Sequence, residues 1–461
     1  MKIARREAVA VSLGIALVVA AFVVPHLSLG IVTPLIHSSP QEIHDLADTA
    51  PIFGWWKAHV GWGSIAAVAI GIAAVLWGPS LAQRLSWRVL TLVTWATSCA
   101  WAFALAMIDG WQLGFAGRLV ARHEYLRQVP AITDIPQMLR TFSSRILDYQ
   151  PNSWITHVSG HPPGALLTFV WLDRIGLSGG AWAGAFCLLV GSSAATAVIV
   201  AVRAVSDEAT ARMAAPFVAV APTAIWIAVS ADAYFAGVAA WGIALLALAA
   251  SRTVRWPIPV AAGAGLLLGW AIFLNYGLVL MGLPALAVLI AVRDRRGALA
   301  ALAAAVPAAV AVVVAFAAAG FWWFDGYTLV QQRYWQGIAM NRPFQYWGWA
   351  NLASVACAIG LGSVAGLGRV FDIAAIRGRS GLHLLVLAAM AAILCADLSM
   401  LSKAETERIW LPFMMWLTAA PALLPRSSHR WWLAANVASA ERRFPTAMSA
   451  ANASSTISAN P

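Results

Sequence analysis

The residues best suited to chemistry lie in one long polar loop and three shorter polar stretches between apolar runs. The loop, residues 109–160, is the longest stretch without a candidate membrane span, and loops of such length are usually functional or disordered. Asp109 opens it at the end of an apolar run, where partial desolvation makes a carboxylate a stronger general base for an alcohol nucleophile. The alternative is that Asp109 only caps the next segment or marks the water interface.

Two histidines close the same loop, in the sequence His157-Val-Ser-Gly-His161-Pro-Pro-Gly. A spacing of four would place both imidazoles on one face of a helix, as in some zinc sites. Gly160, Pro162 and Pro163 argue against a helix through both histidines, and no third ligand is evident. We therefore predict no metal site, and leave a divalent cation open. His157 and His161 are candidates for polar contacts to a sugar or phosphate, the alternative being a simple turn that enters a helix.

Two of the shorter stretches combine polar and aromatic residues. Asp232 lies in Ser-Ala-Asp-Ala-Tyr between two apolar runs, and its alternatives are an ordinary short loop or an N-cap. The stretch Tyr327–Trp349 is rich in Tyr, Trp, Gln and Arg. An aromatic belt at the headgroup level explains the rings, but Arg333 and Arg342 also suit a pocket in which a guanidinium binds phosphate.

The densest group of charges is the stretch Asp397–Arg408, DLSMLSKAETER, directly before an apolar run. We predict that Lys403 or Arg408 neutralises a lipid-linked phosphate while acids such as Glu405 orient the cation. The alternative is a hydrated hairpin between two helices.

The elements that must position these residues are membrane helices. Of the 461 residues, 61% are apolar and only 11% are charged, whereas soluble domains carry roughly 25% charged residues. A membrane span needs about 20 apolar residues, and such runs recur along the whole chain. We predict an all-α, polytopic transmembrane helical bundle of 11–13 spans, with interfacial helices in the loop 109–160. It forms one domain, residues 1–440, followed by a disordered tail, residues 441–461. The candidate spans are 8–30, 58–78, 89–108, 180–202, 213–230, 233–250, 258–273, 278–292, 298–320, 349–367, 382–396 and 409–424.

The basic residues predict the orientation of this bundle. They fall in short clusters between apolar runs, which is typical of cytoplasmic loops, and no basic stripe carries the interleaved aromatics of a nucleic-acid binder. With these basic clusters on the cytoplasmic side, the loop 109–160, Asp232 and the stretch 397–408 share the outer face of the membrane. Two ways of counting crossings differ by one, so the short segment 162–178 is predicted to dip into the bilayer and return.

The order and spacing of these motifs resemble the C-type glycosyltransferase superfamily, polytopic enzymes that use polyprenyl-phosphate sugars, including protein mannosyltransferases and actinobacterial membrane glycosyltransferases. The resembling features are Asp109 at the start of a long outer loop, the loop's exit through His161-Pro-Pro-Gly, the outer Ser-Ala-Asp232-Ala, and the late Lys-Ala-Glu-Thr-Glu-Arg408. They cover most of the chain from about residue 89 onward.

The resemblance implies a multi-pass plasma-membrane enzyme that needs no cofactor. Its donor would be a polyprenyl-phosphate sugar and its acceptor a cell-envelope glycan or lipid, with Asp109 deprotonating the acceptor hydroxyl and the anomeric carbon inverting. The chain departs from the family in having Gly110 where a second acid is expected, so that Glu124, Asp134 or Asp148 would have to supply it. Two other classes stay open: a transporter or lipid flippase, and a non-catalytic membrane protein.

Overall fold

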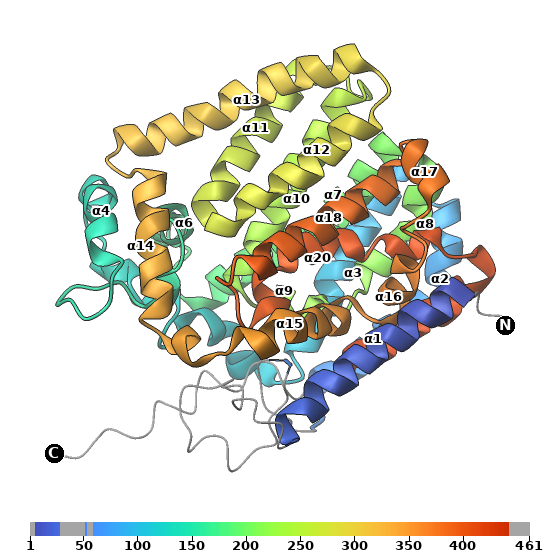
Figure 1. The fold of residues 1–461 in the computed structure, drawn as a ribbon, viewed down its shortest axis with the longest axis horizontal. Helices are drawn as coiled ribbons and strands as arrows, with labels where there is room; N and C mark the ends of the chain where they lie inside the picture. The colour runs from blue at the N-terminus through green and yellow to red at the C-terminus, as the bar shows by residue number, and fades with distance from the viewer. Residues whose placement is uncertain (1–4, 28–50, 53–58, 442–461) are drawn as a thin grey trace.

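The structure is a computed structural model, and it describes residues 5–27, 51–52 and 59–441. All the regular elements among these residues are helices, which confirms the predicted all-α class (Figure 1). The tail predicted to be disordered falls, from residue 442 onward, outside the described residues.

Eight helices of the described chain are long and apolar enough to cross a membrane, which confirms a polytopic bundle. Each lies within a few residues of a predicted span, and the apolar length needed to cross a hydrocarbon core explains the agreement. These helices are α1 (Arg5–Val23), α2 (Trp62–Arg84), α3 (Trp87–Ala106), α7 (Gly180–Val205), α10 (Ala231–Ala250), α11 (Pro257–Leu274), α13 (Arg295–Ala318) and α18 (Gly381–Leu398).

Four apolar runs that were predicted as single spans form shorter or broken helices. The clearest break is at Gly360, whose φ of 81° is in the left-handed region that favours glycine, so that the run bends by 113° there. The elements in these four runs are α8 (Glu208–Ala219) and α9 (Ala224–Ile227), α12 (Gly282–Ala291), α15 (Phe344–Ile359) and α16 (Leu361–Leu367), and α20 (Leu411–Leu417).

The long loop is built from short helical pieces on the left of Figure 1. The predicted interfacial segment contains α4 (Ile135–Thr141), which begins where the Asp134 carboxylate accepts a hydrogen bond from the Gln137 amide at 2.9 Å. After the loop comes α6 (Pro163–Arg174), with 12 residues. A helix of that length is about 18 Å long, well short of a hydrocarbon core of about 30 Å. Segment 162–178 is therefore too short as a helix to cross the bilayer by itself.

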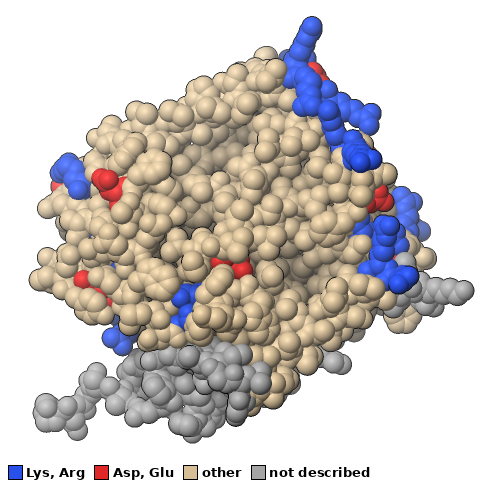
Figure 2. Space-filling view, in the orientation of Figure 1, with Lys and Arg blue, Asp and Glu red and all other residues tan. Residues whose placement is uncertain are grey.

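The charges divide along the molecule. Figure 2 shows the basic side chains concentrated at the right-hand edge, over the ends of α12, α13 and α17 (Ile373–Arg377) in Figure 1. Asp232 lies in the first turn of α10, and this helix runs from the loop side of the bundle to the basic edge. The two ends of α10 therefore lie in different environments. The end with Asp232 is near the long loop, and the other end is at the basic edge.

Small residues bring α11 and α13 into close contact. Gly265 and Gly269 are four apart on α11 and lie against Ala305 and Ala309 of α13, where a Cβ at Gly269 would stand 2.9 Å from the Ala309 Cα. A Cβ at Gly265 would overlap the Ala305 carbonyl. Glycines at this spacing let two membrane helices pack backbone to backbone, so the pair fixes the position of α13.

Replacing Gly265 by leucine is therefore expected to push α11 and α13 apart, because the backbone of α13 cannot yield as a side chain would. The cost of such overpacking is about 1–3 kcal/mol or more, and it appears as a lower Tm of the detergent-solubilised protein. Gly263→Leu is the matched control, since a Cβ there would meet only the Leu245 Cδ1 at 3.8 Å. Equal Tm values for the two variants would contradict this packing.

Candidate functional site

The guanidinium of Arg408 is the centre of a charged cluster drawn from three distant parts of the chain. Its Nη1 lies 3.7 Å from Glu124 Oε1, its Nε lies 3.5 Å from Asp232 Oδ2, and its Nη2 donates to Glu405 Oε2 at 3.1 Å. Asp232 is 4% exposed, while the side chains of Arg408 and Glu405 are 19% and 26% exposed. Three carboxylates therefore surround one largely buried cation that keeps a path to solvent.

His157 connects two members of the cluster. Its Nδ1 lies 3.0 Å from Glu124 Oε1 and its Nε2 lies 3.4 Å from Arg408 Nη2. Because a guanidinium can only donate, Nε2 is the acceptor, and the proton of a neutral His157 lies on Nδ1, toward Glu124. The contact to Glu124 is polar but not a well-aligned hydrogen bond.

The surrounding charges favour the ionised forms of Glu124 and Arg408. Burial alone would raise the pKa of Glu124, but His157 and the positive charges of Arg408 and Arg118 outweigh it and lower the pKa to about 2. Burial alone would likewise lower the pKa of Arg408, and the carboxylates of Asp232, Glu405 and Glu124 instead raise it. The charges of Glu124 and Arg408 are thus stabilised by their neighbours.

Local structure explains how each residue reaches the cluster. The Ser230 hydroxyl accepts a hydrogen bond from the Ala233 amide at 3.2 Å, which starts α10 and places Asp232 in its first turn. Arg408 lies in α19 (Thr406–Ile409), directly after a connection in which Met400, Ala404 and Glu405 all have positive φ. Non-glycine residues in this region cost free energy and gather at functional sites.

His161 is held beside the cluster in a defined tautomer. Burial lowers its pKa to about 3, so the imidazole is neutral near pH 7. Its Nδ1 lies 2.7 Å from the His157 carbonyl oxygen, which requires the proton on Nδ1 and leaves Nε2 as an acceptor. Its ring also lies 5.7 Å from the ring of Tyr125, a residue that the sequence did not single out.

Arg118 is the second residue that the sequence did not single out. Burial lowers its pKa to about 10, against the opposing effects of Glu124 and Asp109. It thus interacts electrostatically with the carboxylate at the start of the loop and with one in the Arg408 cluster. Nothing in the sequence separates it from Arg122, four residues later, which is exposed.

Asp109 pairs with a histidine that precedes the second helix. His59 Nε2 lies 2.9 Å from Asp109 Oδ1, and the two side chains are 29% and 26% exposed. The pair is therefore partly open to solvent, and Arg118 interacts electrostatically both with Asp109 and with Glu124 of the Arg408 cluster.

The other predicted residues lie around this centre. Arg333 forms an ion pair with Asp148 and donates from Nε to the Ser159 hydroxyl at 3.2 Å, two residues after His157. Arg342 lies 3.6 Å from Glu405 Oε1. Lys403 is 3% exposed, and its Nζ donates to the Ala339 carbonyl at 2.7 Å and lies 4.3 Å from the Trp335 ring centre. The Lys403 ammonium thus stabilises the connection that precedes α19.

Among the residues that the structure describes, no group of three or more His, Cys, Asp or Glu side chains is arranged to hold a metal ion. In the cluster itself, Glu124, Asp232 and Glu405 are engaged by Arg408.

Comparison with known proteins gives a likeness of fold. No protein-family model matches the sequence, and no curated protein matches it. Among solved structures, the apo oligosaccharyltransferase of Archaeoglobus fulgidus matches with a TM-score of 0.50 at 12% identity, over 73% of this chain and 50% of that one. The oligosaccharyltransferase AglB of the same organism, in complex with an inhibitory peptide and a dolichol-phosphate, matches with a TM-score of 0.44 at 13% identity.

The chain therefore resembles this oligosaccharyltransferase in fold, and it spans about half the length of the enzyme that it matches. At 12% identity the likeness concerns the fold alone.

The depressed pKa of Glu124 makes stability depend on pH in a defined direction. Because the pKa is about 2 in the folded protein against an ordinary 4.5, the folded state binds fewer protons than the unfolded state. The ionised Glu124 carboxylate therefore contributes on the order of 3 kcal/mol to the free energy of unfolding. This contribution is complete above about pH 4.5 and is lost as the pH falls toward 2.

Glu124→Gln removes this titration. We expect the variant to melt below the wild type at pH 7, with the difference shrinking as the pH is lowered to 3. The measurement is Tm against pH for both proteins in the same detergent. Parallel curves over this range would contradict the ion pairing of Glu124.

Proposed function

We propose that the protein is an integral membrane glycosyltransferase that moves a sugar from a polyprenyl-phosphate donor to an acceptor in the cell envelope, at the plasma membrane. The observation that carries the proposal is the Arg408 cluster, a largely buried cation amid three carboxylates, within a fold shared with a membrane oligosaccharyltransferase. Neither a transporter nor a scaffold requires such a group at a helix end beside a long loop.

The donor's phosphate is assigned to Arg408. A guanidinium binds phosphate oxygens through two parallel hydrogen bonds, and such a partner stabilises the negative charge that develops on the leaving phosphate. Glu405 is the most exposed of the three carboxylates around Arg408 and lies in the strained connection before α19. It is the one that an incoming phosphate displaces, with Arg342 remaining nearby to receive it.

The acceptor hydroxyl is assigned to Asp109. This carboxylate takes the hydroxyl proton as the acceptor oxygen attacks the anomeric carbon, and the bond from that carbon to the phosphate oxygen breaks. The polyprenyl phosphate leaves with the electron pair, so one displacement inverts the anomeric configuration. His59 orients the carboxylate from 2.9 Å, in the way that a general base is commonly held by a neighbouring group.

Of the three acids that might serve as a second carboxylate, Glu124 fits best. Asp134 caps α4, and Asp148 is paired with Arg333. Glu124 instead touches both His157 and Arg408. Its role is to hold the two groups that face the donor, while His157, His161 and Asp232 complete the polar surface around the sugar.

The test is transfer of radiolabelled sugar from polyprenyl-phosphate mannose, arabinose or glucose to cell-envelope glycans by the purified protein. Asp109→Asn is expected to lower the transfer rate by about 10²–10⁴, the usual contribution of a general base. Arg408→Gln is expected to lower it as well, because the leaving phosphate loses its cation.

Asp325→Asn is the matched control, since Asp325 is an exposed acid on α14 (Trp323–Trp335), outside the cluster. It should transfer sugar at the wild-type rate. No transfer from any of the three donors, together with unchanged envelope glycans in a deletion strain, would refute the proposal that the protein is a glycosyltransferase. Full activity of Asp109→Asn would refute the assigned base.

A further inference from the structure

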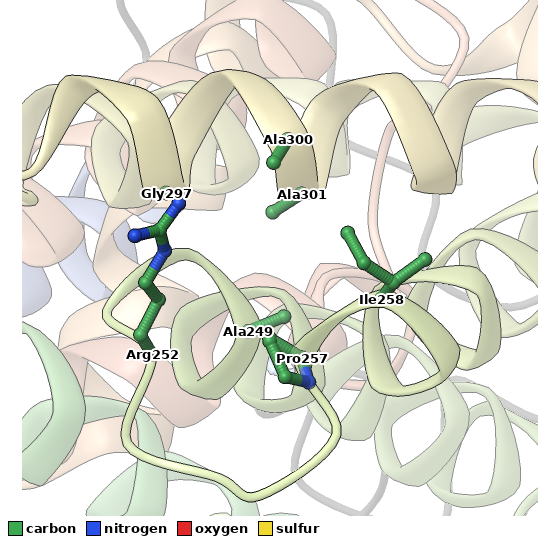
Figure 3. A pocket seen from close by; sticks show the side chains of 7 residues that line it. All are labelled: Ala249, Arg252, Pro257, Ile258, Gly297, Ala300 and Ala301. Carbon is green, nitrogen blue, oxygen red and sulfur yellow. The ribbon is translucent and has the colours of Figure 1, made fainter.

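A second site lies at the opposite end of α10 from Asp232. A cavity of about 320 Å³ is lined by Ala249, Arg252, Pro257, Ile258, Gly297, Ala300 and Ala301 (Figure 3). From Asp232 to Ala249 the helix advances about 25 Å, so this cavity is separate from the Arg408 cluster. Nothing in the proposed transfer reaction uses it.

The cavity has one charged rim and otherwise apolar walls. Figure 3 shows the Arg252 side chain extending from the loop after α10 toward Gly297 at the start of α13. The rest of the lining comes from Ala249 of α10, Pro257 and Ile258 of α11, and Ala300 and Ala301 of α13. The volume is within the range of small-molecule pockets, roughly 300–1,000 Å³. Ile258 is 51% exposed, so the apolar wall continues onto the lipid-facing surface.

The surroundings of the cavity are strongly basic. Arg252, Arg255, Arg293, Arg295 and Arg296 are all exposed there, and Asp294 is the one acid in the same two loops. Asp294 Oδ1 accepts a hydrogen bond from the Arg296 amide at 3.0 Å, and its Oδ2 lies 3.4 Å from Arg252 Nε, so this single carboxylate offsets only part of the charge of the five arginines. The neighbouring Trp256 is 63% exposed, as expected for a ring at a headgroup boundary.

We infer that this cavity binds an anionic phospholipid, with the phosphate at Arg252 and the upper part of an acyl chain against Ile258 and Ala300. A soluble anion would not use the apolar walls, and a neutral lipid would not use the five arginines. Basic pockets between membrane helices hold anionic headgroups by the same combination. The bound lipid has a structural or regulatory role, and its binding does not depend on the proposed transfer reaction.

The experiment is native mass spectrometry of the full-length protein in detergent, titrated with phosphatidylglycerol or phosphatidylcholine of the same chain length. The wild type is expected to bind phosphatidylglycerol more tightly. Arg252→Gln should weaken phosphatidylglycerol binding about five-fold, the effect of one cation near a lipid headgroup. Ala300→Leu should weaken binding of both lipids, because it fills the cavity without changing its charge.

Arg377→Gln is the matched control, since Arg377 is an exposed arginine of α17 that does not line the cavity. It should leave the preference unchanged. Two results would overturn the inference: an equal loss in Arg377→Gln and Arg252→Gln, which indicates only diffuse attraction to the basic edge, or an Ala300→Leu variant that binds as the wild type does. Equal affinity for glycerol phosphate and for phosphatidylglycerol would contradict a role for the acyl chain.

Discussion

A charged group taken out of water must be paired, and the Arg408 guanidinium imposes that condition on the end of the bundle where it lies. Its partners are Glu124 in the long loop, Asp232 at the start of α10 and Glu405 before α19. Leaving a buried charge without its partner typically costs 3–5 kcal/mol. The loop, α10 and α19 therefore have to meet at one point, and they do so although more than 280 residues separate Glu124 from Arg408.

The same interaction links fold to chemistry. Helices such as α11 and α13 pack through small residues and need no charge between them, which leaves the ionisable groups free to collect where the helices end. An arginine whose positive charge is secured by three carboxylates is poised to exchange one of them for phosphate. The partly exposed Asp109–His59 pair is positioned separately. Binding of the leaving group is therefore assigned to Arg408 in α19, and deprotonation of the acceptor to the start of the long loop.

Much of this arrangement could be predicted from the sequence, because charges that interrupt apolar runs are conspicuous. Asp232 and the stretch ending at Arg408 were identified for that reason, and the eight long spans followed from apolar length. Arg118, Tyr125 and His59 were not, since their residue types are ordinary in polar segments and only the folded chain shows which arginine is turned inward. The bend at Gly360 was also missed, because composition does not reveal that a glycine within an apolar run adopts a positive φ.

The central claim is that Arg408 recognises the phosphate of a polyprenyl-phosphate donor. The most direct measurement is the affinity of the purified protein for polyprenyl phosphate and for the uncharged polyprenol of equal length, in wild type and Arg408→Gln. The wild type is predicted to prefer the phosphate at least about ten-fold, as hydrogen bonds to a charged group allow, and the variant to lose that preference. An equal preference in both proteins would contradict the account.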